Sequence, residues 1–281
     1  MIRIACAADV DRLKQIWSEC FGDGEPYIDF FFRNAFVPAS TIVAEEDGQV
    51  CAMLFLLESS VCFQGQENRA AYLYAAATLP QYRSRGIMGG MIRFAADFCR
   101  SAGFHSIVLV PAEESLFGYY GRSGFKTAFY GAYESFRVSE HTGPAAAVLP
   151  VDIPEMERMR REALRQCGGL MWHGREFCYA VHEHLFTGGE ILFTRAGYVL
   201  YHREGDLCCV DEWIARPDRE EELRSALQHS VRATEYRIIR PPRAGDDETA
   251  VRARGMILPL TDDHNFTAGP ADKPYIGLTL G

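Results

Sequence analysis

The chain has 281 residues, 48% of them hydrophobic, and its 29 basic and 38 acidic side chains give a formal charge of −9. This length predicts about two domains, each with enough apolar residues for a core. The acidic balance and the lack of a basic stripe exclude nucleic acid as an expected partner, and they weakly favour an amine-bearing substrate. No apolar run approaches the ~18 residues of a membrane helix, so we expect no membrane partner.

Cysteine usage and the N-terminal segment predict the compartment. The chain has nine cysteines, an odd number, with no Cys-x-x-Cys spacing and mostly within apolar runs. We therefore expect reduced core thiols in a cytoplasmic protein. The segment Met1–Asp9 lacks the apolar core of a secretory signal, which agrees with that expectation.

The histidines of the second half do not predict a metal site. Two ligands on one helix face need the spacing His-x-x-x-His, and His182 and His184 are only two residues apart. The other histidines of this cluster are His173 and His202. The sequence therefore predicts no metal.

Apolar periodicity in the first half predicts the order strand, two helices, three strands, helix, strand, helix and strand. The expected strands are Ile2–Cys6, Thr41–Glu46, Val50–Ser60, Asn68–Leu79, His105–Val110 and Ala128–Val138. The expected helices are one capped by Asp9, then Glu25–Phe36, Met88–Cys99 and a short one within Leu116–Phe125. Aromatic side chains of the second helix are expected mainly in the core, although some of them could line a substrate pocket.

The stretch Thr78–Gly90 joins a predicted strand to a predicted helix. Pro80 ends the strand because it cannot donate to a strand ladder, so Arg83, Arg85 and Gly86 fall where the helix begins. A helix start presents unpaired N–H groups and the positive end of the macrodipole, and a glycine there lets a ligand approach the backbone. Two arginines beside bare amides suit a pyrophosphate group.

Two segments of this half resemble one enzyme family. Arg83-Ser84-Arg85-Gly86-Ile87-Met88 is similar to the Arg/Gln-x-x-Gly-x-Gly/Ala signature of the GNAT superfamily of N-acetyltransferases, whose loop binds the pyrophosphate of acetyl-CoA. Met88 departs from the signature, because Gly or Ala is usual there. Tyr120–Phe125 resembles the tyrosine-bearing helix and turn that close the family's domain. The resemblance covers roughly residues 1–138.

The resemblance implies an α/β fold with a mixed, mostly antiparallel sheet flanked by helices. The strand ending at Leu79 should splay from the strand Ile107–Val110, so that the pantetheine arm of acetyl-CoA enters the gap. Backbone groups of Ala77, Thr78 and Leu79 would pair with this arm, and one amide would polarise the acetyl carbonyl. Tyr120 would protonate the departing thiolate of CoA. The residues assigned to the pyrophosphate are Arg83, Ser84, Arg85, Gly86, Ile87, Met88 and Gly89.

The second half predicts a further domain of similar order. Residues 139–150, rich in Gly, Pro and Ala, are expected to link a first domain at 1–138 to a second at 151–281. The expected elements are helices at Pro154–Gln166, Arg175–Phe186 and Asp218–Thr234 and strands at Glu190–Thr194, Tyr198–His202, Leu207–Ile214, Tyr236–Arg240, Met256–Leu260 and Tyr275–Leu280. Because the corresponding turn, Arg216–Arg219, lacks the glycine, we interpret this half as a degenerate GNAT-like domain.

Together these expectations describe an acetyl-CoA-dependent N-acetyltransferase without a metal, acting on the primary amine of a small molecule or peptide. The amine would attack the thioester directly after losing a proton to a base. The base is left open among Glu58, Glu67, Glu113, Glu114 and the terminal carboxylate of Gly281. Nothing in the sequence predicts the oligomeric state.

Two other functions stay open. A protein that kept the fold but lost catalysis would bind acyl-CoA and regulate without turnover, and Met88 in the signature is the feature that favours it. An aminoacyltransferase of the tandem GNAT-like kind would use a charged tRNA as donor. The loop Arg83–Gly86 argues against the aminoacyltransferase, since a pyrophosphate cradle suits CoA better.

Overall fold

The computed structural model describes residues 1–138, 147–261 and 273–280, so most of the expected linker lies outside the described residues. The described chain forms two compact units. Unit 1 contains Met1–Ser59, Asn68–Lys126 and a segment that starts at Met256, and unit 2 contains Ser60–Glu67, Thr127–Gly255 and the final described segment. Each unit therefore draws on separate parts of the chain, whereas the sequence suggested two continuous ranges.

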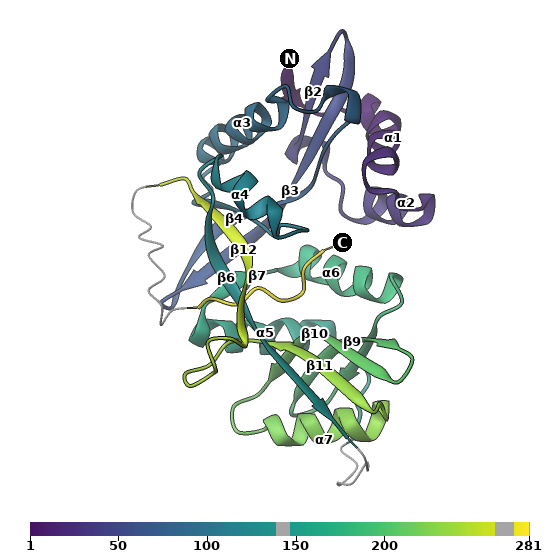
Figure 1. The fold of residues 1–281 in the computed structure, drawn as a ribbon, viewed down its shortest axis with the longest axis vertical. Helices are drawn as coiled ribbons and strands as arrows, with labels where there is room; N and C mark the ends of the chain where they lie inside the picture. Colours follow the sequence, from purple (N-terminus) through teal and green to yellow (C-terminus); the bar gives the residue numbers. More distant parts are fainter. Residues whose placement is uncertain (139–146, 262–272, 281) are drawn as a thin grey trace. The chain divides into compact units, whose positions relative to one another are not determined.

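Unit 1 is a sheet with helices on both faces (Figure 1). Its strands, in hydrogen-bonded order, are β1 (Ile2–Ile4), β2 (Thr41–Glu46), β3 (Gln49–Phe63), β4 (Gln66–Thr78), β5 (Ser106–Leu109) and the end of β12 (Val251–Pro259). Its helices are α1 (Val10–Phe21), α2 (Glu25–Asn34), α3 (Ile87–Ser101) and α4 (Ser115–Gly121). β4 and β5 are parallel, whereas the pairs β1–β2, β2–β3 and β5–β12 are antiparallel. The mixed, mostly antiparallel sheet is confirmed.

An aromatic cluster holds α1 and α2 on one face of this sheet. The centroid of the Trp17 ring lies 4.8 Å from that of Phe31 and 5.6 Å from that of Phe55. These three side chains are at most 1% exposed, and burying each of them contributes about 1.5–3 kcal/mol. α3 lies on the other side of β2 and β3 (Figure 1). The expected core packing of α2 is thus confirmed for Phe31, while Phe32 is only half-buried.

The side chain of Asp9 does not cap α1 as expected. It makes no capping hydrogen bond to that helix. Its carboxylate instead pairs with the Arg3 guanidinium at 2.7 Å and accepts the Cys6 N–H at 2.7 Å. The hydrogen bond from Arg3 is the main cause that holds the pKa of Asp9 well below its usual range, against the opposing effect of burial. Asp9 therefore ties the short turn Ala7–Asp9 to β1 rather than starting the helix.

Unit 2 contains further strands and three further helices. Its strands, in hydrogen-bonded order, are β6 (Lys126–Arg137), β11 (Glu235–Arg240), β10 (Leu207–Ala215), β9 (Gly197–Glu204) and β8 (Glu190–Phe193). Only β10 and β11 are parallel among these pairs. The helices are α5 (Ile153–Cys167), α6 (Gly174–Phe186) and α7 (Glu220–Val231). Apolar side chains of α7, among them Leu223 and Leu227, join the core formed by Trp213 and Tyr236.

Two strands of unit 2 differ from the expectation. The short strand β7 (Gly169–Met171), which pairs with Ser60–Cys62 of β3, was not predicted. The strand expected at Tyr275–Leu280 is wrong, because only Tyr275 makes a strand-like bridge. Leu278 has a left-handed φ of 35°, and its carbonyl accepts the indole N–H of Trp172 at 2.9 Å. The Trp172 side chain therefore satisfies the Leu278 carbonyl in place of a neighbouring strand.

A fully buried ion pair joins α5 to β10. Arg160 is 1% and Glu212 is 0% exposed. Arg160 Nε lies 2.7 Å from Glu212 Oε1, which also accepts the Tyr198 hydroxyl at 2.8 Å. Burial alone would lower the pKa of Arg160, but the Glu212 carboxylate raises it overall, so the guanidinium stays charged. Among the described residues, Arg160 Nη2 and Glu212 Oε2 have no hydrogen-bond partner. Because both charges are shielded from water, removal of either residue would leave the charge of the other buried and uncompensated.

We expect the loss of one member of this pair to destabilise the protein strongly. Glu212→Gln leaves the Arg160 charge buried and uncompensated, so it should lower the free energy of unfolding by about 3–5 kcal/mol. Glu162→Gln removes an exposed partner of Arg158 on α5 and should cost less than about 1 kcal/mol. Urea denaturation followed by circular dichroism measures both values, and equal effects would contradict the importance of the buried pair.

Candidate active site

The sheet of unit 1 opens between β4 and β5. Their parallel register ends at Tyr72 and Val108, although β4 continues to Thr78. Within this continuation Ala75 has a φ of 46°, in the left-handed region that residues with a side chain rarely adopt. Such a residue costs roughly 1–2 kcal/mol and interrupts the regular course of the strand. The strands thus part near the site where their divergence was expected.

The backbone at the end of β4 presents successive residues to opposite sides. The Leu79 N–H donates to the Cys51 carbonyl of β3 at 3.0 Å, and the Leu79 carbonyl accepts the Tyr82 N–H at 2.9 Å. Since neighbours in a strand point to opposite sides, Ala77 also faces β3, whereas the N–H of Thr78 faces the side of β5. Of the three residues expected to meet a pantetheine arm, Thr78 is therefore the best placed. Its side-chain Oγ1 is buried without a partner among the described residues.

The turn between β4 and α3 is exposed and ends in a glycine. Pro80–Tyr82 form a 3-10 turn, and α3 begins at Ile87. Gly86 precedes the helix with a φ of 77°, and a Cβ there would meet no atom within 4 Å. Ser84 is left-handed as well, with a φ of 63°. Left-handed residues in such a turn orient successive N–H groups toward one side, which suits an anion.

The first turn of α3 supplies further amides. Its first backbone hydrogen bond runs from the Gly90 N–H to the Gly86 carbonyl at 3.1 Å, so the N–H groups of Ile87, Met88 and Gly89 precede the hydrogen-bonded ladder. The 15-residue helix places the positive end of its macrodipole at this turn. Met88 is 9% exposed. Its side chain is buried, so the departure from the GNAT signature does not add an exposed side chain to the turn.

Two arginine side chains flank this turn. Arg83 Nε donates to the Thr78 carbonyl at 2.9 Å, and Arg85 Nη2 donates to the Gln81 carbonyl at 2.8 Å. The Arg85 guanidinium also lies 5.2 Å from the centroid of the Tyr82 ring. Both arginines are exposed, and a guanidinium has five N–H donors, so each retains donors for a ligand. The turn therefore carries two anchored cations beside the amides of α3.

Tyr120 lies in the last turn of α4 and is half-buried. Its ring centroid is 5.2 Å from that of Tyr119 and 5.8 Å from that of Phe125, both in edge-on contact. The Phe125 N–H donates to the Tyr120 carbonyl at 3.3 Å and closes the turn after the helix. Burial raises the pKa of Tyr120 to about 12. Its hydroxyl therefore stays protonated near neutral pH and is able to donate a proton.

The carboxylates considered as a general base differ in their surroundings. Glu58 forms an exposed ion pair with an arginine of β4. Glu67 belongs to unit 2, where it lies 2.9 Å from a histidine ring nitrogen. Glu113 and Glu114 are exposed where α4 begins, and Gly281 lies outside the described residues. The structure assigns the base to none of them.

A tyrosine pair that the sequence did not suggest lies between α2 and β4. The hydroxyl oxygens of Tyr27 and Tyr74 are 2.8 Å apart. Tyr74 is 8% exposed and Tyr27 is half-buried. The pair places polar groups in the aromatic cluster around Trp17, whose ring lies 5.7 Å from that of Tyr74. Because the two tyrosines are 47 residues apart, no local pattern could have revealed their contact.

In unit 2, Ser60 and His173 resemble part of a hydrolase triad, but the histidine nitrogen that faces the serine carries a proton and cannot act as a base. Ser60 Oγ lies 2.7 Å from His173 Nε2, and Arg161 Nη2 lies 3.2 Å from His173 Nδ1. An arginine can only donate, so Nδ1 is the acceptor and Nε2 carries the proton. Nε2 then has no lone pair with which to accept the serine proton.

A cavity of about 710 Å³ in this unit, lined by Trp213 and Arg216 among others, contains none of the predicted site residues.

Comparison with known proteins identifies the domain that carries this site. Residues 1–128 match the model of one family, described as an acetyltransferase (GNAT) domain. We call these matched residues the GNAT domain. The match includes the turn after β4 and Tyr120 of α4. No match was found among the curated proteins.

Solved structures extend the likeness beyond the GNAT domain. A GCN5-related N-acetyltransferase from Anabaena variabilis has a TM-score of 0.75 at 15% identity, covering 93% of this chain and 73% of that chain. One from Kribbella flavida has a TM-score of 0.73 at 17% identity, covering 92% and 72%. Eis1 from Mycobacterium abscessus has a TM-score of 0.69 at 16% identity, covering 92% and 74%. The second half therefore also matches folds of GNAT proteins.

The left-handed residue in β4 of the GNAT domain allows a test of the strand's strain. Ala75→Gly removes the side chain that disfavours this conformation, and this gain offsets the ~0.5–1 kcal/mol that glycine costs in a strand. The free energy of unfolding should therefore stay unchanged or rise by up to about 1 kcal/mol. Ala71→Gly, in the paired part of the same strand, should lower it by about 1 kcal/mol or more. Denaturant titration of both variants checks this, and an equal loss in both would contradict the strain.

Proposed function

We propose that the protein is an acetyl-CoA-dependent N-acetyltransferase that acetylates a primary amine of a small molecule or peptide. The observation that carries this proposal is the combination, within the GNAT domain, of two features. The ladder between β4 and β5 ends at Tyr72 and Val108, and the exposed turn at Gly86 leads into the N-terminus of α3. A long, partly extended ligand with a pyrophosphate group fits both features at once.

The pyrophosphate is assigned to the turn and to the first residues of α3. The amides of Ile87, Met88 and Gly89 point into the region before the helix, and the macrodipole favours an anion there. Arg83 and Arg85 add positive charge at the rim. Gly86 leaves the space that a Cβ would take, so that phosphate oxygens approach the backbone closely.

The reacting end is assigned to the gap between β4 and β5. Acetyl-CoA supplies an activated acetyl group as a thioester. The N–H of Thr78 faces this gap and would donate to the acetyl carbonyl oxygen as negative charge develops on it. As the amine nitrogen forms its bond to the carbonyl carbon and loses one proton to solvent, the carbon–sulfur bond breaks and Tyr120 passes its phenolic proton to the sulfur. Solvent then returns a proton to Tyr120.

One further observation supports a cytoplasmic location. All nine cysteines fall in the described part of the chain and are free thiols, as expected in a reducing compartment. Among the helices of the described residues, none combines the length and apolar character that crossing a membrane requires.

Binding of acetyl-CoA should depend on the two arginines of the turn. Calorimetric titration of acetyl-CoA into the wild type should show micromolar affinity, and Arg83→Ala with Arg85→Ala should weaken it at least tenfold, because two charge-assisted contacts to phosphate are lost. The double variant Arg33→Ala with Arg137→Ala removes the same charge from exposed positions elsewhere and should bind as the wild type does. Absence of binding by the wild type would refute the assignment of the turn to CoA.

Turnover should depend on the hydroxyl of Tyr120. Tyr120→Phe keeps the ring contacts but removes the proton donor, so kcat for thiol release should fall about 10²–10⁴-fold while acetyl-CoA binding is retained. Tyr119→Phe, on the same helix, is the matched control and should stay within about twofold.

The pH profile supplies a second readout of the same assignment. Because the pKa of Tyr120 is about 12, its proton-donating form persists up to that value, and Tyr120 should cause no loss of rate between pH 7 and roughly pH 10. Wild-type turnover in Tyr120→Phe would contradict the role. Binding of acetyl-CoA without thiol release for any amine would favour a non-catalytic acyl-CoA-binding protein instead.

A further inference from the structure

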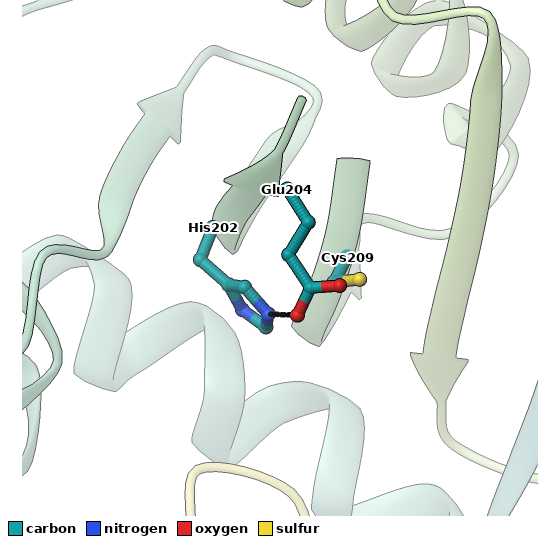
Figure 2. A group of neighbouring side chains, drawn as sticks. All are labelled: His202, Glu204 and Cys209. Atoms are coloured by element: carbon teal, nitrogen blue, oxygen red, sulfur yellow. Dashed lines mark ion pairs between the residues drawn. The ribbon is translucent and has the colours of Figure 1, made fainter. Parts of the chain in front are cut away.

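The hairpin β9–β10 of unit 2 gathers three side chains of different chemistry on one face. His202 and Glu204 are two residues apart on β9, so they project to the same side of the sheet. Cys209 on β10 is the direct cross-strand partner of His202. Side chains in such pairs have Cβ atoms only about 4.5–5.5 Å apart. The register of the hairpin therefore brings an imidazole, a carboxylate and a thiol together (Figure 2).

The three groups turn their polar atoms toward one another. His202 Nε2 lies 3.4 Å from Glu204 Oε1 (Figure 2), and Cys209 Sγ completes a group whose ligand atoms all lie within 4.8 Å of each other. Two ligands held by one tetrahedral zinc ion at about 2.1 Å are roughly 3.4 Å apart. The nitrogen and the carboxylate oxygen already have this separation, and Cys209 Sγ lies within 4.8 Å of both.

The second nitrogen of His202 is held by another carboxylate. His202 Nδ1 lies 2.9 Å from Asp211 Oδ2. Asp211 reaches this position because the register of β10 shifts between Val210 and Glu212, which lets Glu212 point into the core. A carboxylate at Nδ1 fixes the tautomer with its proton there and leaves Nε2 as a ligand atom. This arrangement, carboxylate to histidine to metal, is usual behind metal-bound histidines.

The charges around this group favour a cation. Glu204 and Asp211 supply two carboxylates beside the imidazole of His202. Among the basic side chains around it, His184 Nδ1 lies 3.8 Å from Asp211 Oδ2, and Arg237 lies opposite Cys209 on β11 and pairs with Glu235 at 3.1 Å. The arginine is therefore balanced by its own partner.

We propose that His202, Glu204 and Cys209 bind a divalent transition metal, with zinc the best fit, and that Asp211 is a positioning residue for His202. Nitrogen and sulfur donors select zinc-like ions over magnesium and calcium, which prefer oxygen ligands. Three protein ligands leave a fourth position for water or for a ligand atom of another molecule. The site is distinct from the proposed acetyl-transfer site, because all four residues belong to unit 2.

The His-x-x-x-His spacing considered in the sequence could not reveal this site. That spacing applies to helices, whereas these ligands come from the two strands of a hairpin. His202 and Cys209 become neighbours only through the cross-strand register. The glutamate two residues after the histidine is the one local hint.

Metal titration of the full-length protein tests the proposal without reference to acetyl transfer. The purified, chelator-treated protein is titrated with zinc by calorimetry, and with cobalt(II) by absorption, where a bound thiolate gives a sulfur-to-cobalt charge-transfer band. The wild type should bind one equivalent of either metal and show the band. Cys209→Ser should lose the band, and Cys209→Ser and Glu204→Gln should each weaken zinc binding at least tenfold.

The positioning role and the controls have their own outcomes. Asp211→Asn should keep the cobalt band but weaken zinc binding about 10–100-fold, the usual cost of losing such a partner. Cys6→Ser and His229→Ala, at positions outside this hairpin, should change neither measurement. Because the Glu204 side chain is 63% exposed, Glu204→Gln should fold normally. The zinc titration of this variant therefore still tests the proposal if one of the other variants fails to fold. Absence of metal binding by the wild type, or an unchanged cobalt band in Cys209→Ser, would overturn the proposal.

Discussion

The candidate active site exists because two parallel strands stop pairing. β4 and β5 share a ladder as far as Tyr72 and Val108, and beyond that point the backbone of β4 has no strand on its β5 side in the described register. Unpaired backbone groups within a sheet are costly unless another partner satisfies them. A ligand with amide groups of its own is such a partner. The opening, rather than any single side chain, is thus what makes this sheet suited to an extended substrate.

Packing on the rest of unit 1 keeps this opening in place. Trp17, Phe31 and Phe55 pack α1 and α2 against one face of the sheet, and α3 covers the other (Figure 1). α3 therefore serves two purposes, because its buried side chains anchor the sheet while its N-terminus ends at the open turn. The left-handed Ala75 lies between these fixed parts. Strain of this kind persists only where the surrounding core over-determines the backbone.

Local patterns were sufficient for most of the elements and for the turn of the site. The arginines, Gly86 and the helical periodicity after it occur within one short stretch, so the sequence alone predicted a turn leading into a helix N-terminus. The alternation of β4 likewise predicted a strand, but nothing in an alanine-rich run indicated which alanine would be left-handed. The hydrogen bond from the Leu79 N–H to the Cys51 carbonyl depends on the pairing of two strands, so no local pattern predicted it.

Features formed by distant residues could not be predicted in the same way. Tyr27 meets Tyr74, and His202 meets Cys209, only through tertiary packing or strand register. The buried Arg160 and Glu212 look in the sequence like ordinary surface charges of a helix and a strand. Tyr275–Leu280 was predicted as a strand from its apolar pattern. Its apolar side chains are indeed buried, but the segment does not pair as a strand beyond the bridge at Tyr275. Periodicity reports which residues are buried, but it does not report which partners bury them.

The strand β12 makes unit 1 discontinuous in the sequence. Its residues Met256–Pro259 pair with β5, although the family match ends at residue 128. Residues 129–255 thus separate the matched region from this paired part of β12 in the sequence. Recombination at the end of the matched region would deliver a sheet whose β5 has an open edge, and open edges invite association with other chains. The edge of β5 is therefore covered only when both parts of the chain are present.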